Sequence, residues 1–393
     1  MHLTDKKIIF HALFLVSMLL SACGGGGGGG GGTTTVRSAY VANSGDGTIS
    51  QYTIGGGGAL TPKGTPTVAS MVGNPGSSPT SVTVDPAGKY AYVANSGNEV
   101  ISQFTIGTGG GLVPMIPPTV PSGSAGSGPV SITVDPTGRY AYAANSSSND
   151  VAQFTIDAMT GALSPMGTPT VTPCPSPPCA QGMWPVSVTV DAKSQYVYVA
   201  NLTSDTVSQF AIGPGGALTP MSTATVGTGL NPISVAVAGD STGSKYVYVA
   251  NNGSANVSQY IIGATGALTP NGTPIAAGNI LAPPTAITVA GDITGSKYVY
   301  VTTGSDISRY TINLDGTLAL PLMNPTFPAG SGPQSVTVAG DSTGSKYVYV
   351  ANRLSNDVWQ YSIDATTGAL TQMALPVATG SLPWSITTAV SAQ

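Results

Sequence analysis

Short stretches of alternating apolar and polar residues recur along the chain and predict paired β-strands. The stretch SKYVYVANNGSANVSQY, from Ser244 to Tyr260, contains two such runs around a polar turn rich in Asn, Gly and Ser. Alternation with a period of two is typical of a half-buried strand, and this turn composition is typical of a hairpin. The pattern therefore predicts a β-hairpin, and near-copies elsewhere indicate that it is repeated.

The repeat has a period of about 50 residues, which is typical of propellers and solenoids. Its most regular part is the segment YVAN or a close variant, which ends at Asn43, Asn95, Asn145, Asn201, Asn251, Thr303 and Asn352. The copy that begins at Pro129 reads PVSITVDPTG, RYAYAAN, NDVAQFTID and GALSPMGTPTV, four segments bounded by turn residues. We expect these to be strands A to D of a four-stranded blade, and seven copies predict an all-β, seven-bladed β-propeller.

The two ends of the chain complement each other. The first copy, from Ala39 to Val68, has no strand A, whereas the C-terminal segment PWSITTAVSAQ has the sequence of a strand A without the three strands that follow it elsewhere. We predict that this C-terminal strand completes the N-terminal blade and closes the ring, which removes two exposed strand edges. A parallel solenoid, the alternative for this period, gives no reason for complementary ends.

The N-terminal residues MHLTDKKIIFHALFLVSMLLSAC have the pattern of a secretory signal. Lys6 and Lys7 precede an apolar run that is too short to span a membrane. The ending LSAC resembles a bacterial lipobox, which implies that Cys23 is acylated and becomes the mature N-terminus. Cleavage after Ala22 as in an ordinary signal peptide is the alternative.

A glycine run from Gly24 to Gly32 follows and predicts a flexible tether. We therefore expect a signal peptide at 1–22, a lipid anchor and tether at 23–35, and a single propeller domain at 36–393. The protein is expected to be anchored in the cell envelope outside the cytoplasm. Gly24 in place of Asp favours the outer membrane or the periplasmic face in a Gram-negative host.

Charge and cysteine content narrow the classes of partner. The chain has 12 Lys and Arg residues and 16 Asp and Glu residues, and its basic residues form no cluster. This composition argues against nucleic acid as a partner. Cys174 and Cys179, in the segment CPSPPC, are the cysteines that remain after the anchor, and in an exported protein we expect them to form a disulfide.

The repeated YVAN, followed by S.SNDV.QFTID..TGALTPMGTPTV and then P.SVTVDP.GKY, resembles the YVTN-repeat, lactonase-like seven-bladed β-propeller family over roughly Arg37 to Ala389. The resemblance implies the propeller fold and a lactonase activity on sugar lactones such as 6-phosphogluconolactone, with His, Arg and Glu at the channel mouth. His2 and His11 are the histidines of this sequence, and both lie in the predicted signal peptide, so the mature chain is expected to have no histidine. Glu99 is the sole glutamate. We therefore predict a ligand-binding or protein-interaction module without a cofactor, and a lactonase-like hydrolase is the alternative.

The loops between strands D and A and between strands B and C are expected to share one face of the ring. Acidic residues recur in the B–C turns at Asp46, Glu99, Asp150, Asp205, Asp306 and Asp357. Such a ring of carboxylates is able to hold a hard cation, but tight turns need the same residues, so we predict turn chemistry and no metal. The DPAGK, DPTGR and AGDSTGSK hairpins of the opposite face are also interpreted as turns.

Departures from the repeat mark candidate ligand-binding residues. Arg309 replaces a glutamine found in the six other copies, and with nearby Asp306 it is a candidate for receiving a carboxylate or phosphate. A partly buried arginine paired with a neighbouring blade is the alternative. The residue after each strand-A proline is expected to rim the channel: Thr80, Val130, Val186, Ile233, Thr285, Gln334 and Trp384. Of these we select Gln334 and Trp384, together with Trp184 and Arg353, as candidates for binding a small molecule or a protein, with channel packing as the alternative.

Overall fold

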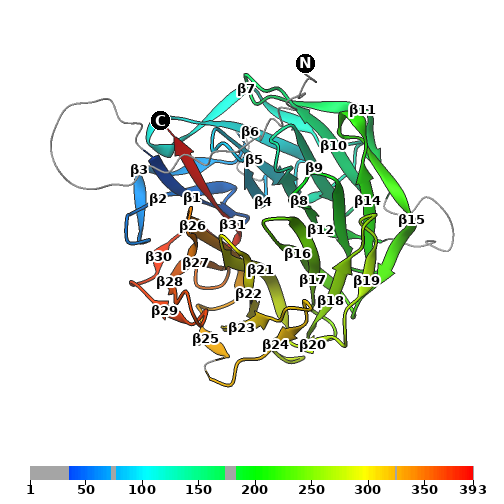
Figure 1. Ribbon diagram of the computed structural model, residues 1–393. Helices are drawn as coiled ribbons and strands as arrows, with labels where there is room; N and C mark the ends of the chain where they lie inside the picture. Colours follow the sequence, from blue (N-terminus) through cyan, green and yellow to red (C-terminus); the bar gives the residue numbers. More distant parts are fainter. Residues whose placement is uncertain (1–34, 72–76, 173–182, 324, 393) are drawn as a thin grey trace, which may run out of the picture. The chain divides into compact units, whose positions relative to one another are not determined.

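The repeated strand pattern folds into antiparallel blades around a common centre, as Figure 1 shows. The computed structural model describes residues 35–71, 77–172, 183–323 and 325–392. The predicted signal peptide, Cys23, and the predicted Cys174–Cys179 disulfide lie outside these residues. Within them, no helix is long and apolar enough to cross a membrane.

The first four blades each contain four strands, which run in order from strand A at the centre to strand D at the outer edge. Blades 1 and 2 consist of β31 (Pro383–Ala392), β1 (Thr35–Asn43), β2 (Thr48–Ile54) and β3 (Leu60–Ala69), and of β4 (Pro79–Val84), β5 (Tyr90–Asn95), β6 (Val100–Ile106) and β7 (Leu112–Pro121). Blades 3 and 4 consist of β8 (Pro129–Val134), β9 (Tyr140–Asn145), β10 (Asp150–Ile156) and β11 (Leu163–Val171), and of β12 (Pro185–Val190), β13 (Tyr196–Asn201), β14 (Thr206–Ile212) and β15 (Leu218–Gly227).

In the last three blades strand D is divided into two short pieces. Blade 5 consists of β16 (Pro232–Asp240), β17 (Gly243–Asn251), β18 (Asn256–Ile262), β19 (Leu268–Pro270) and β20 (Ile275–Ala276). Blades 6 and 7 consist of β21 (Pro284–Asp292), β22 (Gly295–Thr303), β23 (Asp306–Ile312), β24 (Leu318–Ala319) and β25 (Thr326–Pro328), and of β26 (Pro333–Asp341), β27 (Gly344–Asn352), β28 (Asp357–Ile363), β29 (Leu370–Gln372) and β30 (Val377–Ala378). Two 3-10 turns, η1 (Thr108–Gly110) and η2 (Pro214–Gly216), interrupt C–D connections.

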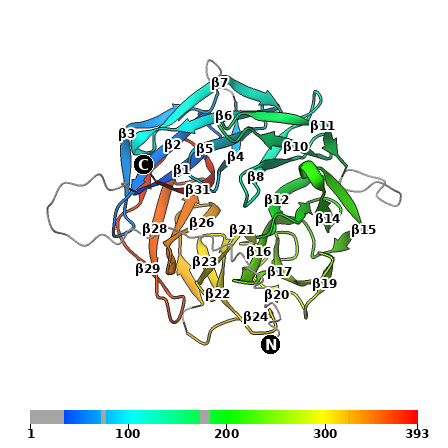
Figure 2. The ribbon, with the colours of Figure 1, turned by 45° about the horizontal axis from the view of Figure 1, so that its top comes forward.

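The predicted closure of the ring is present. Strand β31 pairs antiparallel with β1 along its whole length, from Thr35 opposite Ala392 to Asn43 opposite Pro383. The innermost strand of each blade also packs on the innermost strands of both neighbours, and Figure 2 shows β31 between β4 and β26. The C-terminal strand therefore completes both the first blade and the inner ring of strands.

Buried side chains pack between successive blades. Each cluster of buried residues combines two neighbouring blades, as Tyr142 of β9 and Phe210 of β14 illustrate. Burying an aromatic side chain of this kind stabilises the fold by roughly 1.5–3 kcal/mol. Because the blade faces are the core, removing one blade face from its neighbour exposes apolar surface on both.

A tyrosine hydroxyl in strand B of every blade donates a hydrogen bond to a glycine carbonyl in the C–D turn of the next blade. The distances are 2.6–2.7 Å, and the pairs are Tyr40–Gly110, Tyr92–Gly161, Tyr142–Gly216, Tyr198–Gly266, Tyr248–Gly316, Tyr300–Gly368 and Tyr349–Gly58. Burial raises the pKa of Tyr40 to about 12, so its hydroxyl keeps the donated proton at neutral pH.

Glutamines in strand C form a second joint between blades. In six blades the glutamine Oε1 accepts a hydrogen bond from the backbone N–H of the leucine that starts the outer strand of the next blade, at 2.5–2.7 Å. The Nε2 of Gln51 donates to the carbonyl of Thr65, where the register of β2 and β3 shifts. The repeated glutamine is therefore explained by structure, and blade 6 departs from it at Arg309.

Candidate functional site

A ring of bulged residues surrounds the channel mouth at the face of the D–A and B–C loops. In every blade the register between strands A and B shifts immediately after the strand-A proline, which leaves the next residue outside the ladder. Such bulges re-aim a side chain. The seven bulged residues are Thr80, Val130, Val186, Ile233, Thr285, Gln334 and Trp384, the residues expected from the sequence to rim the channel.

The structure brings Arg353 and Trp384 together across the junction of blades 7 and 1. The guanidinium carbon of Arg353 lies 4.7 Å from the centre of the Trp384 ring, within the range of a cation–π contact. The backbone N–H of Arg353 donates to the carbonyl of Gly332 at 2.7 Å, which fixes its turn beside β26. Among the described residues its guanidinium has no hydrogen bond or ion pair, and its Nε is buried without a partner.

Gln334 is the bulged residue of β26, two positions after the acceptor of the Arg353 N–H. Its side-chain amide likewise makes no hydrogen bond within the part of the chain that the structure describes. Gln334, Arg353 and Trp384 are all half-buried. Gln334 and Trp384 are the bulged residues of neighbouring blades, and Arg353 lies over the Trp384 ring. We call these three residues, with their unused donors, the blade 7/1 site.

Most other polar side chains at this mouth are already occupied. The hydroxyls of Thr80 and Thr285 donate to the carbonyls of Pro129 and Pro333, at 3.1 and 2.6 Å, in the next strand A. The Nδ2 of Asn252 donates to the carbonyl of Pro284 at 2.9 Å. The two threonine bonds link innermost strands of successive blades, and the Asn252 bond links a B–C turn to the next innermost strand, so these three donors are not available to a ligand.

The acidic residues of the B–C turns have structural partners. Glu99 and Asp205 each accept a backbone N–H from the D–A loop that follows their blade, and Asp46 accepts one from the loop that leads into its blade, all at 2.7 Å. Asp150 and Asp357 accept from the asparagine that ends strand B of their own blade, at 2.7 and 2.8 Å. In the described ranges no three His, Cys, Asp or Glu side chains are grouped to hold a metal ion. These contacts are those expected of turn chemistry.

Arg309 and Asp306 do not form a joint site. Arg309 is 3% exposed, and its terminal nitrogens donate to the carbonyls of Thr367 in blade 7 and Met323 in its own blade, at 2.8 and 2.9 Å. Its side chain also lies 5.8 Å over the ring of Phe327. Asp306 is exposed at the start of β23, and no ion pair joins it to Arg309 among the described residues. The contacts of Arg309 match the alternative, an arginine bonded to the neighbouring blade.

Trp184 lies on the same face as Trp384 but in a different position. It precedes the strand-A proline of blade 4, has a left-handed φ of 52°, and is 49% exposed. Its backbone N–H donates to the Oδ1 of Asn149 at 2.8 Å. Trp184 therefore stands at the outer edge of the mouth, whereas Trp384 lies in the ring of bulged residues.

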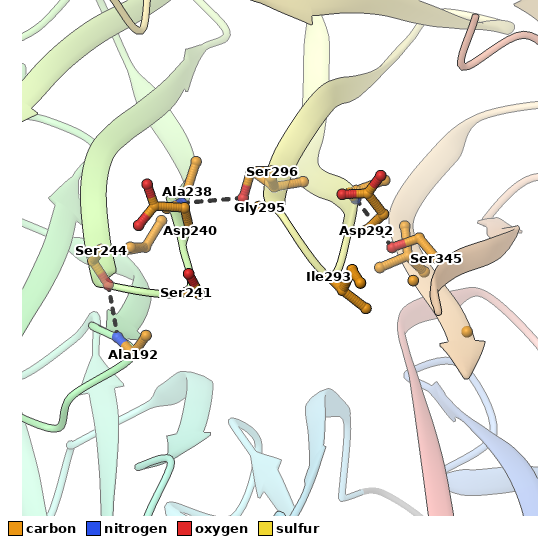
Figure 3. Close-up of a pocket in the computed structure, with 18 of the residues that line it drawn as sticks. Ala192, Ala238, Asp240, Ser241, Ser244, Asp292, Ile293, Gly295, Ser296 and Ser345 are labelled. Carbon is orange, nitrogen blue, oxygen red and sulfur yellow. Dashed lines mark hydrogen bonds between the residues drawn. The ribbon is translucent and has the colours of Figure 1, made fainter. Parts of the chain in front are cut away.

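A cavity of about 650 Å³ opens at the opposite end of the channel, among the A–B hairpins of blades 4 to 7 (Figure 3). Strands A and B have nine residues each in blades 5 to 7, compared with six in blades 2 to 4. The longer hairpins, AGDSTGSK in blades 5 and 7 and AGDITGSK in blade 6, build its wall. The hydroxyls of Ser244, Ser296 and Ser345 accept backbone N–H groups from the preceding blade. Sequence reasoning treated these hairpins as turns, although their extra length in three consecutive blades was a signal of this wall.

The carboxylates of this cavity are held in their charged form. Hydrogen bonds from Lys245 and Thr242 place the pKa of Asp240 well below its usual range. Lys297 and Thr294 do the same for the pKa of Asp292. Hydrogen bonds from Thr343 lower the pKa of Asp341, the third carboxylate that lines the cavity. A carboxylate with a lowered pKa is a weak general base. The cavity therefore has the volume of a small-molecule site but no strong base among these three carboxylates, whereas the blade 7/1 site has free donors at the mouth formed by the D–A and B–C loops.

Comparison with known proteins places the chain among propellers. A family model described as "Lactonase, 7-bladed beta-propeller" matches residues 32–282. No match was found among curated protein sequences.

Several solved structures share the architecture. A candidate 6-phosphogluconolactonase from Bacteroides fragilis superposes with a TM-score of 0.73 at 19% identity, covering 90% of this chain and 98% of that one. The periplasmic gluconolactonase PpgL of Pseudomonas aeruginosa gives 0.71 at 16% identity, covering 91% and 99%. Hydrazine synthase of Kuenenia stuttgartiensis gives 0.56 at 16% identity, covering 80% and 95%. At these identities the likeness concerns the fold, and the fold carries different chemistries.

Proposed function

We propose, from the premise that this chain belongs to the lactonase family of seven-bladed β-propellers, that it hydrolyses a lactone at the blade 7/1 site. The observation that carries the proposal is the unpaired guanidinium of Arg353, held over the ring of Trp384 at the channel mouth. Two structural neighbours described as lactonases support the choice of reaction.

The roles of the side chains follow from the chemistry of lactone opening. Attack of water on the ring carbonyl places negative charge on the carbonyl oxygen, and preoriented donors stabilise that charge. The guanidinium of Arg353 has such donors, and its stack on Trp384 fixes their direction. Gln334 adds amide donors on the same side of the mouth.

His2 and His11, the histidines of this sequence, both lie in the predicted signal peptide, so the general base for the water is a carboxylate, a lysine or a tyrosine. Of these we propose a carboxylate. Two carboxylates lie in the turns that carry or follow the blade 7/1 site. Asp357 ends the turn that begins with Arg353, and Asp46 accepts the N–H of Ser381, three residues before Trp384. Either is a candidate base.

Kinetics with purified protein tests this proposal. We expect Arg353→Ala to lower kcat/KM for a hydrolysed lactone by about 100-fold, the cost of losing one donor to the developing oxyanion. Arg353→Lys retains part of the activity, because it keeps the charge but loses the planar donor geometry. The melting temperature should stay within about 2 °C of the parent value, because Arg353 bonds to no other described side chain.

The matched control is Arg139→Ala. Arg139 also lies over an aromatic ring, that of Tyr140 at 5.5 Å, but it belongs to an A–B hairpin at the other end of the channel. Normal activity is expected in this variant. Activity that survives Arg353→Ala but is lost on replacing Asp240 or Asp292 would move the site to the 650 Å³ cavity.

Binding without turnover is the second candidate function. It is favoured because both histidines, His2 and His11, lie in the predicted signal peptide, so the mature chain is expected to have no imidazole to act as a general base. Calorimetry would then detect binding of an intact lactone to the purified protein, whereas no tested lactone would be hydrolysed faster than in buffer alone. Loss of that binding in Arg353→Ala would retain the blade 7/1 site and assign it to recognition.

A lipid anchor at Cys23 is a further part of the proposal, supported by the LSAC sequence that precedes the glycine run. Three acyl chains, at about 0.8 kcal/mol per buried CH₂, hold such a protein on a membrane almost permanently. Expressed in a bacterium, the parent should partition into detergent and carry an acylated N-terminal Cys23 by mass spectrometry. Cys23→Ser is expected to be released in soluble form; acylation elsewhere in the chain would disprove the assignment.

A further inference from the structure

The mouth that contains the blade 7/1 site is polar on one side and apolar on the other. The bulged residues of blades 3, 4 and 5 are Val130, Val186 and Ile233, all half-buried in the ring around the channel. Trp184 and Leu230, in the loops that enter blades 4 and 5, precede Val186 and Ile233 by two and three residues and are 49% and 56% exposed. We call these five side chains the apolar arc.

The charges around this mouth disfavour a multiply anionic ligand. Arg353 is the one cationic residue in the described D–A and B–C loops. The B–C turns place carboxylates at the same face in six blades: Asp46, Glu99, Asp150, Asp205, Asp306 and Asp357. A phosphate group carries nearly two negative charges and is normally bound by several basic side chains or backbone N–H groups.

The side-chain donors without a described partner gather at the blade 7/1 site, opposite the apolar arc. The threonines among the bulged residues, Thr80 and Thr285, donate to strand-A carbonyls. Among the described bulged residues, the side-chain donors without a described partner therefore belong to Gln334 and Trp384, and the guanidinium of Arg353 lies over the Trp384 ring. The apolar arc offers aliphatic and indole surface to whatever part of a ligand extends across the channel from these donors. A polyhydroxylated sugar ring would leave its hydroxyls unmatched there, which costs binding free energy.

We propose that the substrate is an uncharged lactone with an apolar substituent, its carbonyl at Arg353 and its substituent on the apolar arc. This inference rests on the proposed lactone hydrolysis and narrows its substrate class. It excludes phosphorylated sugar lactones as good substrates.

A matched series of lactones tests the inference. The probes are γ-butyrolactone, γ-decalactone with its six-carbon side chain, glucono-δ-lactone and 6-phosphoglucono-δ-lactone. Because each buried methylene adds favourable transfer free energy, kcat/KM for γ-decalactone should exceed that for γ-butyrolactone tenfold or more. The phosphorylated lactone should be hydrolysed more slowly than glucono-δ-lactone.

Two variants test whether the apolar arc contacts the apolar substituent of the substrate. Ile233→Ser should reduce the ratio of kcat/KM for γ-decalactone over γ-butyrolactone at least threefold. Val237 lies on the same strand as Ile233 but lines the cavity at the opposite end of the channel. The control variant Val237→Ser should therefore leave this ratio unchanged. A ratio unaffected by Ile233→Ser, or reduced equally by Val237→Ser, would overturn the placement of the substituent.

The outcomes separate this inference from the proposed function. Equal rates with both γ-lactones, or a preference for the phosphorylated lactone, would overturn the inference while leaving lactone hydrolysis in place. If no lactone is hydrolysed but γ-decalactone binds at least tenfold more tightly than γ-butyrolactone in calorimetry, the proposed hydrolysis fails and the apolar preference stands. If the intact lactones bind equally or not at all, the inference is overturned.

Discussion

Deleting residues 383–393 is expected to abolish cooperative folding. The deletion removes β31, which pairs with β1 from Thr35 to Asn43 and packs between the innermost strands of blades 2 and 7. It would leave β1 as an exposed edge and open the ring of inner strands. Loss on this scale is comparable to the whole stability of a domain, about 5–15 kcal/mol, so we expect aggregation or a broad, non-cooperative transition in calorimetry.

A circular permutant supplies the control. It begins at Pro383, joins Gln393 to Thr35 through a short glycine linker and ends at Leu382, so that blade 1 becomes continuous in the chain. Thr35 and Ala392 are opposite each other in the sheet, which makes a short linker sufficient. The permutant should unfold in one transition near the parent temperature. A truncated chain that unfolds as cooperatively as the parent would show that β31 is dispensable.

Gly216→Ala is expected to be strongly destabilising, far more so than the same change at the adjacent Gly215. Both glycines have left-handed φ angles, 87° and 78°. A Cβ at Gly216 would lie 2.3 Å from the Tyr140 ring, whereas one at Gly215 would meet no atom within 4 Å. The left-handed backbone costs an alanine about 1–2 kcal/mol at either site, and the clash adds about 1–3 kcal/mol at Gly216 alone.

Urea unfolding of the two variants measures this difference directly. The carbonyl of Gly216 also accepts the hydroxyl of Tyr142 at 2.6 Å, so any displacement of the turn weakens the joint between blades 3 and 4. Gly215→Ala isolates the backbone cost, because it changes neither contact. Equal losses of stability in the two variants would mean that the turn moves freely and that the glycine serves only the backbone conformation.

The repeat was sufficient to predict the blades, but not how neighbouring blades are joined. Alternation and turn residues placed the strands, and the unmatched ends of the chain predicted the pairing of β31 with β1. The bond from Tyr142 to Gly216 joins residues 74 positions apart, and the sequence does not reveal which tyrosine meets which glycine. The division of strand D in blades 5 to 7 was also missed, because a continuous strand was assumed there.

The part of the candidate site that could be predicted is the part whose strand positions followed from aligning the repeats. Trp384 and Arg353 were each located as departures from the repeat, and ring closure places blade 1 beside blade 7, so that the two meet. Arg309 and Asp306 are three residues apart on β23, and side chains at that spacing point to opposite faces of a strand. Period-two reasoning alone was therefore enough to argue against grouping them.

The tyrosine-to-glycine bonds all run in one direction around the ring, from strand B of one blade to the turn of the next. Every blade thus has a donor side and an acceptor side, like a subunit of a head-to-tail cyclic oligomer, and the bond from Tyr349 to Gly58 is one more copy of the same contact. Where the last blade meets the first, this bond has the same partners and length as at the other joints. These bonds therefore do not limit the number of blades: duplication or loss of a blade would leave every remaining strand-B tyrosine facing a glycine carbonyl in the next blade.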